Sequence, residues 1–368
     1  MIKIHTKYQE DDMNKKYSAF LLALVTGLTL TACAGNEDTN TEKVVDGEEV
    51  VEETGTESKV ETGEIAKIGL GVTVNLASSS ADEKGANAQS DATIAGVAFD
   101  AEGKIVKVII DTAQNKVPVN EGVVEAPEEF KTKKELGPDY NMKPASGIDK
   151  EWDEQIEFLE EYFVGMTADE VMGIEVDEDT FPTDADVLTG ATLKISSYQS
   201  AVANAWENAV DAKGVESIGL GVHTALGHNT KDAEGEKGAT VQFEDNIALI
   251  GLNVDNEVVA SQTDVAQNAV AFTKDGQLDG EYAAGTTKKT LGADYGMKAA
   301  SETAGIGKEW DEQAQAYDDY LVGKDANAIR DIELDETGKG TDADLVTGAT
   351  IIIDGFVAAT EKALNNVK

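Results

Sequence analysis

The pattern of apolar and polar positions divides residues 65–210 into a run of strands followed by helices. Residues 65–76, 92–100 and 104–112 are rich in β-branched side chains and partly alternate, which predicts strands, with a hairpin turn at Asp-Ala-Glu-Gly-Lys. In residues 149–164, Trp152, Ile156, Leu159 and Phe163 recur at helical spacing and predict an amphipathic helix. A second such helix is predicted for residues 194–210. Strands followed by helices predict an α+β fold with an antiparallel sheet.

The same segments return later in the chain. TKKELGPDYNMK at 132–143 recurs as TKKTLGADYGMK at 287–298, and KEWDEQ at 150–155 recurs unchanged at 308–313. The offset between the copies grows from 150 to 155 to 158, so short insertions lie in loops of the second copy. A period this long exceeds that of solenoid repeats. We therefore predict two tandem domains, residues 65–212 and 213–368.

The first 64 residues have a different character. Lys15 and Lys16 precede an apolar run at 20–30, which is too short to span a bilayer and is typical of a secretory signal. Leu-Thr-Ala-Cys at 30–33 resembles the lipobox of bacterial lipoproteins. That resemblance implies that residues 1–32 are a signal peptide, cleaved before a lipidated Cys33, and an alternative is that Cys33 is a buried thiol. Residues 33–64, rich in Glu, Thr and Gly, predict an acidic disordered linker.

Composition excludes several classes of function. A formal net charge of −41 argues against binding to nucleic acid or to anionic lipid headgroups and favours a monomer, because like charges repel. Cys33 is the only cysteine, so an internal disulfide or a cysteine-bound metal is excluded. After Cys33 the only histidines are His223 and His228, which argues against haem attachment and histidine-rich metal sites. We predict no metal site and no catalytic residue.

The segment TDADVLTGATLK at 183–194 returns as TDADLVTGATII at 341–352, although its neighbours have diverged. Each copy ends in a hydroxyl, Thr192 or Thr350, just before a predicted helix, where backbone N–H groups favour an anion. Arg330 is the only arginine, so a phosphate here has little cationic support and would be held best by a covalent bond. A simpler interpretation is a turn and a helix cap.

These segments resemble the D-x-x-[ST]-G-A-[ST] flavinylation motif of the FMN-binding domain family, which includes flavin-carrying subunits of sodium-pumping NADH:quinone reductase and Rnf complexes. The resemblance implies two copies of a twisted, half-barrel-like antiparallel sheet with packed helices. It also implies that a flavin transferase esterifies FMN through its phosphate to the last threonine of each motif. The implied cofactor-binding residues are Asp186, Thr189, Gly190, Ala191 and Thr192 in the first copy and Asp344, Thr347, Gly348, Ala349 and Thr350 in the second.

A flavin ring requires an apolar, aromatic-lined slot. The repeated blocks offer one set of candidates in each copy, namely Tyr140, Met142 and Trp152, and Tyr295, Met297 and Trp310. Aromatic rings stack on a flavin, and methionine packs against aromatic faces. The alternative is that both tryptophans are core residues without a ligand. The lysine pairs at 133–134 and 288–289 either favour a reduced, anionic flavin or belong to a solvated surface.

The lipobox, the acidic spacer and two such domains together resemble Gram-positive surface flavoproteins of extracellular electron transfer. This resemblance implies a lipid-anchored carrier on the outer face of the membrane with two covalent FMN groups. Electrons would pass from the quinone pool, supplied by an NADH dehydrogenase, to extracellular acceptors such as ferric iron. Two alternatives stay open, a flavin-dependent reductase of a defined small molecule and a ligand-binding lipoprotein without a cofactor.

Overall fold

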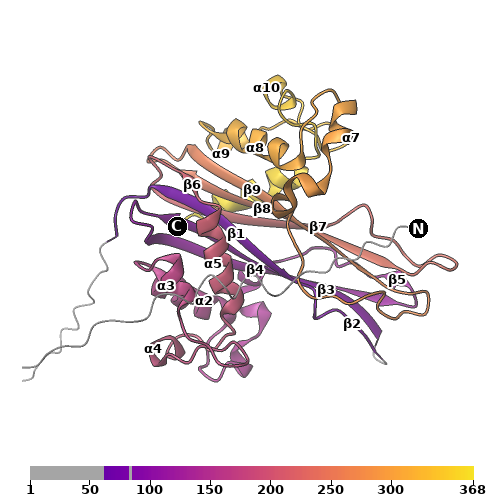
Figure 1. Ribbon diagram of the computed structural model, residues 1–368, viewed down its shortest axis with the longest axis horizontal. Helices are drawn as coiled ribbons and strands as arrows, with labels where there is room; N and C mark the ends of the chain where they lie inside the picture. Colours follow the sequence, from indigo (N-terminus) through magenta and orange to yellow (C-terminus); the bar gives the residue numbers. More distant parts are fainter. Residues whose placement is uncertain (1–61, 83–84) are drawn as a thin grey trace, which may run out of the picture. The chain divides into compact units, whose positions relative to one another are not determined.

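A computed structural model describes residues 62–82 and 85–368, which belong to one compact unit (Figure 1). The predicted signal peptide, Cys33 and nearly all of the acidic linker lie outside the described residues. The predicted α+β class with antiparallel sheets is confirmed. Within the described ranges, no helix combines the length and the apolar character that crossing a membrane requires.

Two antiparallel sheets form the centre of the fold. The first has the order β5-β4-β3-β1-β6, with β2 paired to β3, and the second has the order β7-β8-β9. The strands of the first sheet are β1 (Lys67–Asn75), β2 (Ser80–Asp82), β3 (Gly85–Phe99), β4 (Ile105–Asn120), β5 (Val123–Val124) and β6 (Val210–Asp211). Those of the second sheet are β7 (Ser217–Leu226), β8 (Thr240–Leu252) and β9 (Val258–Ala271).

The predicted strands are present, but β3 and β4 extend further than the pattern indicates. The hairpin turn predicted at 100–104 closes through Asp100, whose N–H donates to the Lys104 carbonyl at 2.9 Å. The prediction for β3 began at residue 92, whereas the strand begins at Gly85. Its first residues, Gly-Ala-Asn-Ala-Gln-Ser, have low strand propensity and are held by pairing with β4 from Ala86 onward and with β2 at Gly85.

The helices follow the strands in the same order in both halves (Figure 1). The first half has α1 (Lys133–Leu136), α2 (Trp152–Phe163), α3 (Ala168–Met172), α4 (Ala185–Leu188) and α5 (Ser196–Glu207), with 3₁₀ turns η2 (Gly137–Tyr140) and η3 (Lys143–Ala145). The second has α6 (Lys288–Leu291), α7 (Lys298–Thr303), α8 (Trp310–Leu321), α9 (Ala326–Arg330), α10 (Ala343–Val346) and α11 (Asp354–Asn365), with the 3₁₀ turn η4 (Gly292–Tyr295). Both long central helices start at a capping box, formed by Glu151 with Glu154 and by Glu309 with Glu312.

Each sheet buries both of its faces. Odd-numbered residues of β3, including Val97 and Phe99, pack with α2 and α5, and the predicted stripe of α2 is fully buried there. Even-numbered residues such as Ile94 face the other way and join residues of the second sheet, including Leu220 and Phe243, in one shared cluster. The fold is therefore layered, with helices outside and the two sheets in contact inside.

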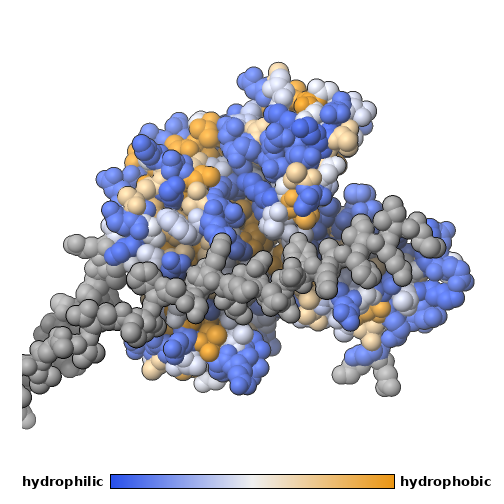
Figure 2. Space-filling model, viewed as in Figure 1, coloured by the Kyte–Doolittle hydropathy of each residue, from blue (hydrophilic) through white to orange (hydrophobic). Residues whose placement is uncertain are grey.

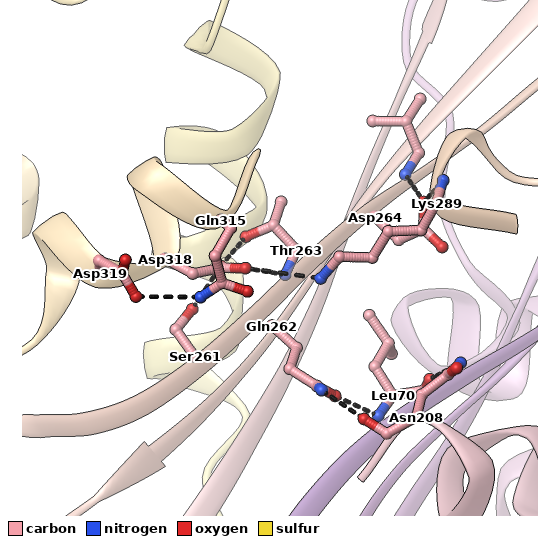
Figure 3. A network of polar contacts seen from close by, with 11 residues as sticks. Leu70, Asn208, Ser261, Gln262, Thr263, Asp264, Lys289, Gln315, Asp318 and Asp319 are labelled. Carbon is pink, nitrogen blue, oxygen red and sulfur yellow. Dashed lines mark hydrogen bonds and ion pairs between the residues drawn. The ribbon is translucent and has the colours of Figure 1, made fainter. Parts of the chain in front are cut away.

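The contact between the two sheets is close and includes polar links. A Cβ at Gly96 would lie 2.7 Å from Leu249 Cδ1, so glycine is what permits this approach. Gln262 on β9 accepts a hydrogen bond from the Leu70 N–H at 2.6 Å and donates to the Asn208 carbonyl at 2.7 Å (Figure 3). Residues 65–212 and 213–368 thus share one core.

Candidate functional site

The two motif segments adopt the same local structure. Asp184 caps α4 by accepting the Asp186 N–H at 2.8 Å, and Asp342 caps α10 by accepting the Asp344 N–H at 2.9 Å. Thr189 turns its hydroxyl back to the Asp186 carbonyl at 2.6 Å, and Thr347 does the same to Asp344 at 3.0 Å. These motif acids and threonines are exposed, whereas Ala191 and Ala349 are buried in the core. The helix cap of the simpler interpretation is therefore present. It caps the short helix inside each motif, and not the long helix α5 or α11 that follows.

The motif glycines are packed against the central helices. A Cβ at Gly190 would lie 2.2 Å from the ring of Phe158 on α2, and one at Gly348 would lie 2.6 Å from Ala316 Cβ on α8. Neither glycine has a positive φ, so close approach rather than backbone freedom explains the residue type. This packing brings each motif glycine against the middle of a long helix.

Each motif threonine is held by a buried glutamine on the neighbouring helix. The Thr192 N–H donates to Gln155 Oε1 at 2.9 Å, and the Thr350 N–H donates to Gln313 Oε1 at 3.0 Å. Both threonine hydroxyls also approach the same oxygen, at 3.3 Å and 3.4 Å. Our sequence predictions missed these glutamines, although both lie in the unchanged KEWDEQ block. The identity of this block in the two copies was the sequence signal that could have identified the glutamines.

The same glutamines connect the threonines to the predicted methionines. Gln155 Nε2 lies 3.7 Å from Met142 Sδ, and Gln313 Nε2 lies 3.5 Å from Met297 Sδ. The methionine backbone is fixed as well, since the Met142 N–H donates to Glu151 Oε2 at 2.7 Å. In the second half the Met297 N–H donates to Glu309 in the same way. The structure therefore brings the motif, the Asp-Tyr-x-Met block and KEWDEQ together in both halves.

A cavity opens beside each motif threonine. The first, of about 670 Å³, is lined by Thr192, Lys133, Met142, Trp152 and Tyr198, among others. The second, of about 570 Å³, is lined by Thr350, Lys288, Tyr295, Met297 and Trp310, among others. Both lie within the size range of small-molecule and cofactor sites.

Of the predicted aromatic residues, Trp152 lines the first cavity, and Tyr295 and Trp310 line the second. Tyr140 contacts Trp152 but is not among the residues that line the first cavity. Tyr140 and Trp152 lie edge to face with ring centroids 6.5 Å apart, and Tyr295 and Trp310 do so at 6.4 Å. Trp152 is fully buried and Trp310 nearly so, which fits a core role, yet both also line a cavity. Tyr140 donates its hydroxyl to Gln114, which lines the first cavity.

One lysine of each predicted pair lies over these rings. Lys133 Nζ is 4.9 Å from the centre of the Tyr140 ring and 5.4 Å from that of Trp152. Lys288 Nζ is 5.3 Å and 5.4 Å from Tyr295 and Trp310. Burial lowers the pKa of both lysines, partly offset by nearby carboxylates. These two lysines are therefore part of the site rather than of a solvated surface.

The other lysine of each pair reaches a buried carboxylate beneath the site. Lys289 Nζ lies 3.6 Å from Asp318, which also accepts the Thr263 N–H and hydroxyl (Figure 3). Lys134 Nζ lies 2.5 Å from Glu160, the corresponding residue of the first half. Burial raises the pKa of Asp318, and the lysine and hydroxyl partners oppose that rise. These pairs anchor α1 and α6 to the central helices.

The walls of the two cavities differ. The first presents Thr112, Ser196 and the hydroxyl of Tyr198, which accepts the Trp152 Nε1–H at 3.0 Å. Burial raises the pKa of Tyr198 to about 12, so its hydroxyl stays protonated. The second presents Val265, Asp354 and Phe356 at the corresponding positions, together with His223, whose pKa burial lowers. None of these wall residues is among the cofactor-binding residues predicted from the sequence.

The residues present fit a flavin. The cavities combine aromatic and thioether surface with a cation and a hydroxyl at which a phosphate could be attached. In the first cavity Thr112 lines the wall next to the Tyr198 hydroxyl, so an edge group of a bound ring could hydrogen-bond to either side chain. Among the described residues no cluster of His, Cys, Asp and Glu is arranged to hold a metal ion.

Comparisons with known proteins add one partial similarity. A chlorophenol reductase from Desulfitobacterium hafniense is 34% identical over 118 residues, which cover 28% of this chain and 36% of that protein. The chain thus spans about a third of the length of this curated relative. No protein-family model matches the chain. No solved structure matches it either.

Proposed function

We propose that this chain is an extracellular, lipid-anchored electron-transfer protein of the FMN-binding domain family, with FMN esterified to Thr192 and Thr350. The observation that carries the proposal is the pairing of a motif threonine with an aromatic-lined cavity, found twice. Each hydroxyl lies at a cavity that also exposes a tryptophan, a methionine and a lysine. A structural turn alone would not require this repeated combination.

Attachment would occur by phosphoryl transfer from FAD, catalysed by a flavin transferase. The threonine Oγ1 would form a bond to the phosphorus on the FMN side, the bond from that phosphorus to the AMP oxygen would break, and AMP would leave. The hydroxyl proton would pass to a base of the transferase. Esterification would keep the cofactor outside the cell, where the single arginine and scattered lysines of this chain could not retain a free phosphate by charge.

Within each cavity, the chain's own residues would position the attachment threonine and keep water from the inner wall. Gln155 and Gln313 hold the threonine backbone, while Trp152 and Trp310 close the inner wall. Lys133 and Lys288 place a positive charge where a reduced, anionic ring would benefit from it. A bound flavin supplies the ability to accept and release electrons.

The surrounding partners follow from the same proposal. The quinone pool, fed by a membrane NADH dehydrogenase, would supply electrons, and ferric iron or similar acceptors would remove them. The net charge of −41 and the largely hydrophilic face in Figure 2 support a solvated carrier that does not self-associate. The acidic surface would also concentrate cationic acceptors near the protein.

Intact mass measured with and without a flavin transferase tests this proposal. We expect two FMN-sized additions in the wild type, one each in Thr192→Ala and Thr350→Ala, and none in the double variant. No addition in any sample would refute the proposal and leave a cofactor-free binding protein as the better account.

A flavin-dependent reductase of a defined small molecule is the second candidate, because the partial relative is a chlorophenol reductase. This candidate predicts saturable turnover with one class of acceptor, including chlorinated phenols, and little activity with unrelated acceptors. The carrier predicts broad, weakly selective reduction. Steady-state assays of the flavin-loaded protein with ferric citrate, a quinone and a chlorophenol distinguish the two.

A further inference from the structure

The loop before the central helix differs in length between the two halves. Seven positions separate Lys143 from Lys150, whereas ten separate the corresponding Lys298 and Lys308. The additional residues are Glu302, Thr303 and Ala304, which follow Ser301. In the first half this stretch forms the short 3₁₀ turn η3, and in the second half it forms the longer helix α7.

The insertion changes what the serine carbonyl at its start can bind. The Ser146 carbonyl accepts the Ile148 N–H at 2.8 Å and also the Thr192 hydroxyl at 2.9 Å. The Ser301 carbonyl accepts the Ala304 N–H at 3.1 Å and the Ile306 N–H at 3.2 Å. A carbonyl oxygen can accept two hydrogen bonds. In the longer loop, N–H groups of the loop itself occupy both positions of the Ser301 carbonyl.

The two motif hydroxyls are consequently held differently. Thr192 Oγ1 donates to the Ser146 carbonyl at 2.9 Å, with Gln155 Oε1 more distant at 3.3 Å. For Thr350 Oγ1 the structure gives an acceptor at 3.4 Å, Gln313 Oε1, which is at the limit of a hydrogen bond. A base that activates Thr192 must take a proton already engaged with a carbonyl, whereas the Thr350 proton is nearly free.

We infer that the two threonines are unequal acceptors and that Thr350 is esterified before Thr192. This inference rests on the proposed function. Breaking one neutral hydrogen bond of about 1 kcal/mol corresponds to a rate difference of about fivefold. Under limiting transferase, a singly loaded form with FMN on Thr350 therefore accumulates first.

The test is a time course of the full mature chain with FAD and limiting flavin transferase, with each threonine followed by peptide mass spectrometry. We expect the Thr350 peptide to gain FMN about five times faster than the Thr192 peptide. Equal rates, or faster modification of Thr192, would overturn the inference. No modification of either threonine would instead refute the proposed function, so the two failures are distinguishable.

Two loop variants test whether the difference in loop length causes the difference in esterification rate. Insertion of Glu-Thr-Ala after Ser146 gives the first half the longer loop and should raise the Thr192 rate to that of Thr350. Deletion of residues 302–304 should lower the Thr350 rate by a similar factor. Circular dichroism and thermal unfolding of each variant verify folding, and the unaltered half of the same chain is an internal control. Unchanged rates in folded variants would overturn the role of the loop.

Discussion

The two cavities share the residues that would hold a cofactor and differ in those that would surround it. Gln155 and Gln313 contact their threonines at nearly the same distance, and Lys133 and Lys288 cover equivalent rings. The walls have diverged, since Tyr198 is replaced by Phe356 and Thr112 by Val265. Both halves thus share the contacts that would position an attached cofactor, whereas the polarity around a bound ring would be specific to each.

The buried tryptophans give the largest expected effect. Trp152→Ala and Trp310→Ala each remove a large core side chain, which should lower the free energy of unfolding by about 3–5 kcal/mol. Trp152→Ala should be the more severe, because it also leaves the buried Tyr198 hydroxyl without its indole donor. Urea unfolding measures both losses. A greater loss for Trp310→Ala would contradict this difference between the walls.

The core between the sheets contains a buried carboxylate, Asp245, whose counterpart in the first half is not titratable. Asp245 on β8 accepts hydrogen bonds from Thr224 and, across the sheets, from Asn115, whereas the position corresponding to it on β3 is Ala92. Burial raises the pKa of Asp245 to about 6 from 3.8. The native state therefore binds a proton that the unfolded state has released, and stability falls as pH rises through this interval.

Asp245→Asn should remove that dependence. Between about pH 4 and pH 6 the wild type should lose about 3 kcal/mol of unfolding free energy relative to the Asn variant, which keeps the shape of the side chain. Urea unfolding at several pH values measures the slope, with the exposed Asp255→Asn as a control. Parallel pH profiles for the wild type and Asp245→Asn would contradict the prediction.

Substitution of the two glutamines tests the contact to the motif threonine that both halves share. Gln155→Met removes the acceptor that fixes the Thr192 N–H, so the motif backbone loses its anchor, and FMN addition at Thr192 should slow about tenfold while Thr350 is unaffected. Gln313→Met should have the reverse effect. Peptide mass spectrometry of a single sample reports both threonines, so each half is the control for the other. Equal slowing at both threonines would indicate a general loss of folding.

The smallest expected effect comes from exchanging the wall hydroxyl. Tyr198→Phe removes the acceptor of the Trp152 indole N–H and should cost about 1 kcal/mol of unfolding free energy. Phe356→Tyr places a hydroxyl at the corresponding position near Trp310, whose ring centroid lies 5.8 Å from that of Phe356. This added hydroxyl should raise the free energy of unfolding by part of that amount. Denaturant unfolding of the single and double variants measures both changes.

Much of the fold could be predicted from the sequence, because strand alternation, the stripe on α2 and the repeated blocks are local signals. The packing of the two sheets could not, since the pattern shows that both faces of β3 are apolar but not what covers each face. The motif threonines were found by repetition. Gln155 was missed because its partner lies 37 positions away, and a polar residue on a helix reads as solvent-facing.

The core shared by the two sheets has a further consequence for how the sites can diverge. A single half, on its own, would expose the apolar face that includes Ile94, and a second identical half would be its natural cover. In such a symmetric pair every substitution would appear in both cavities at once. Joining the halves in one chain breaks that symmetry, so one cavity can acquire Phe356 or a longer loop while the other keeps its own residues.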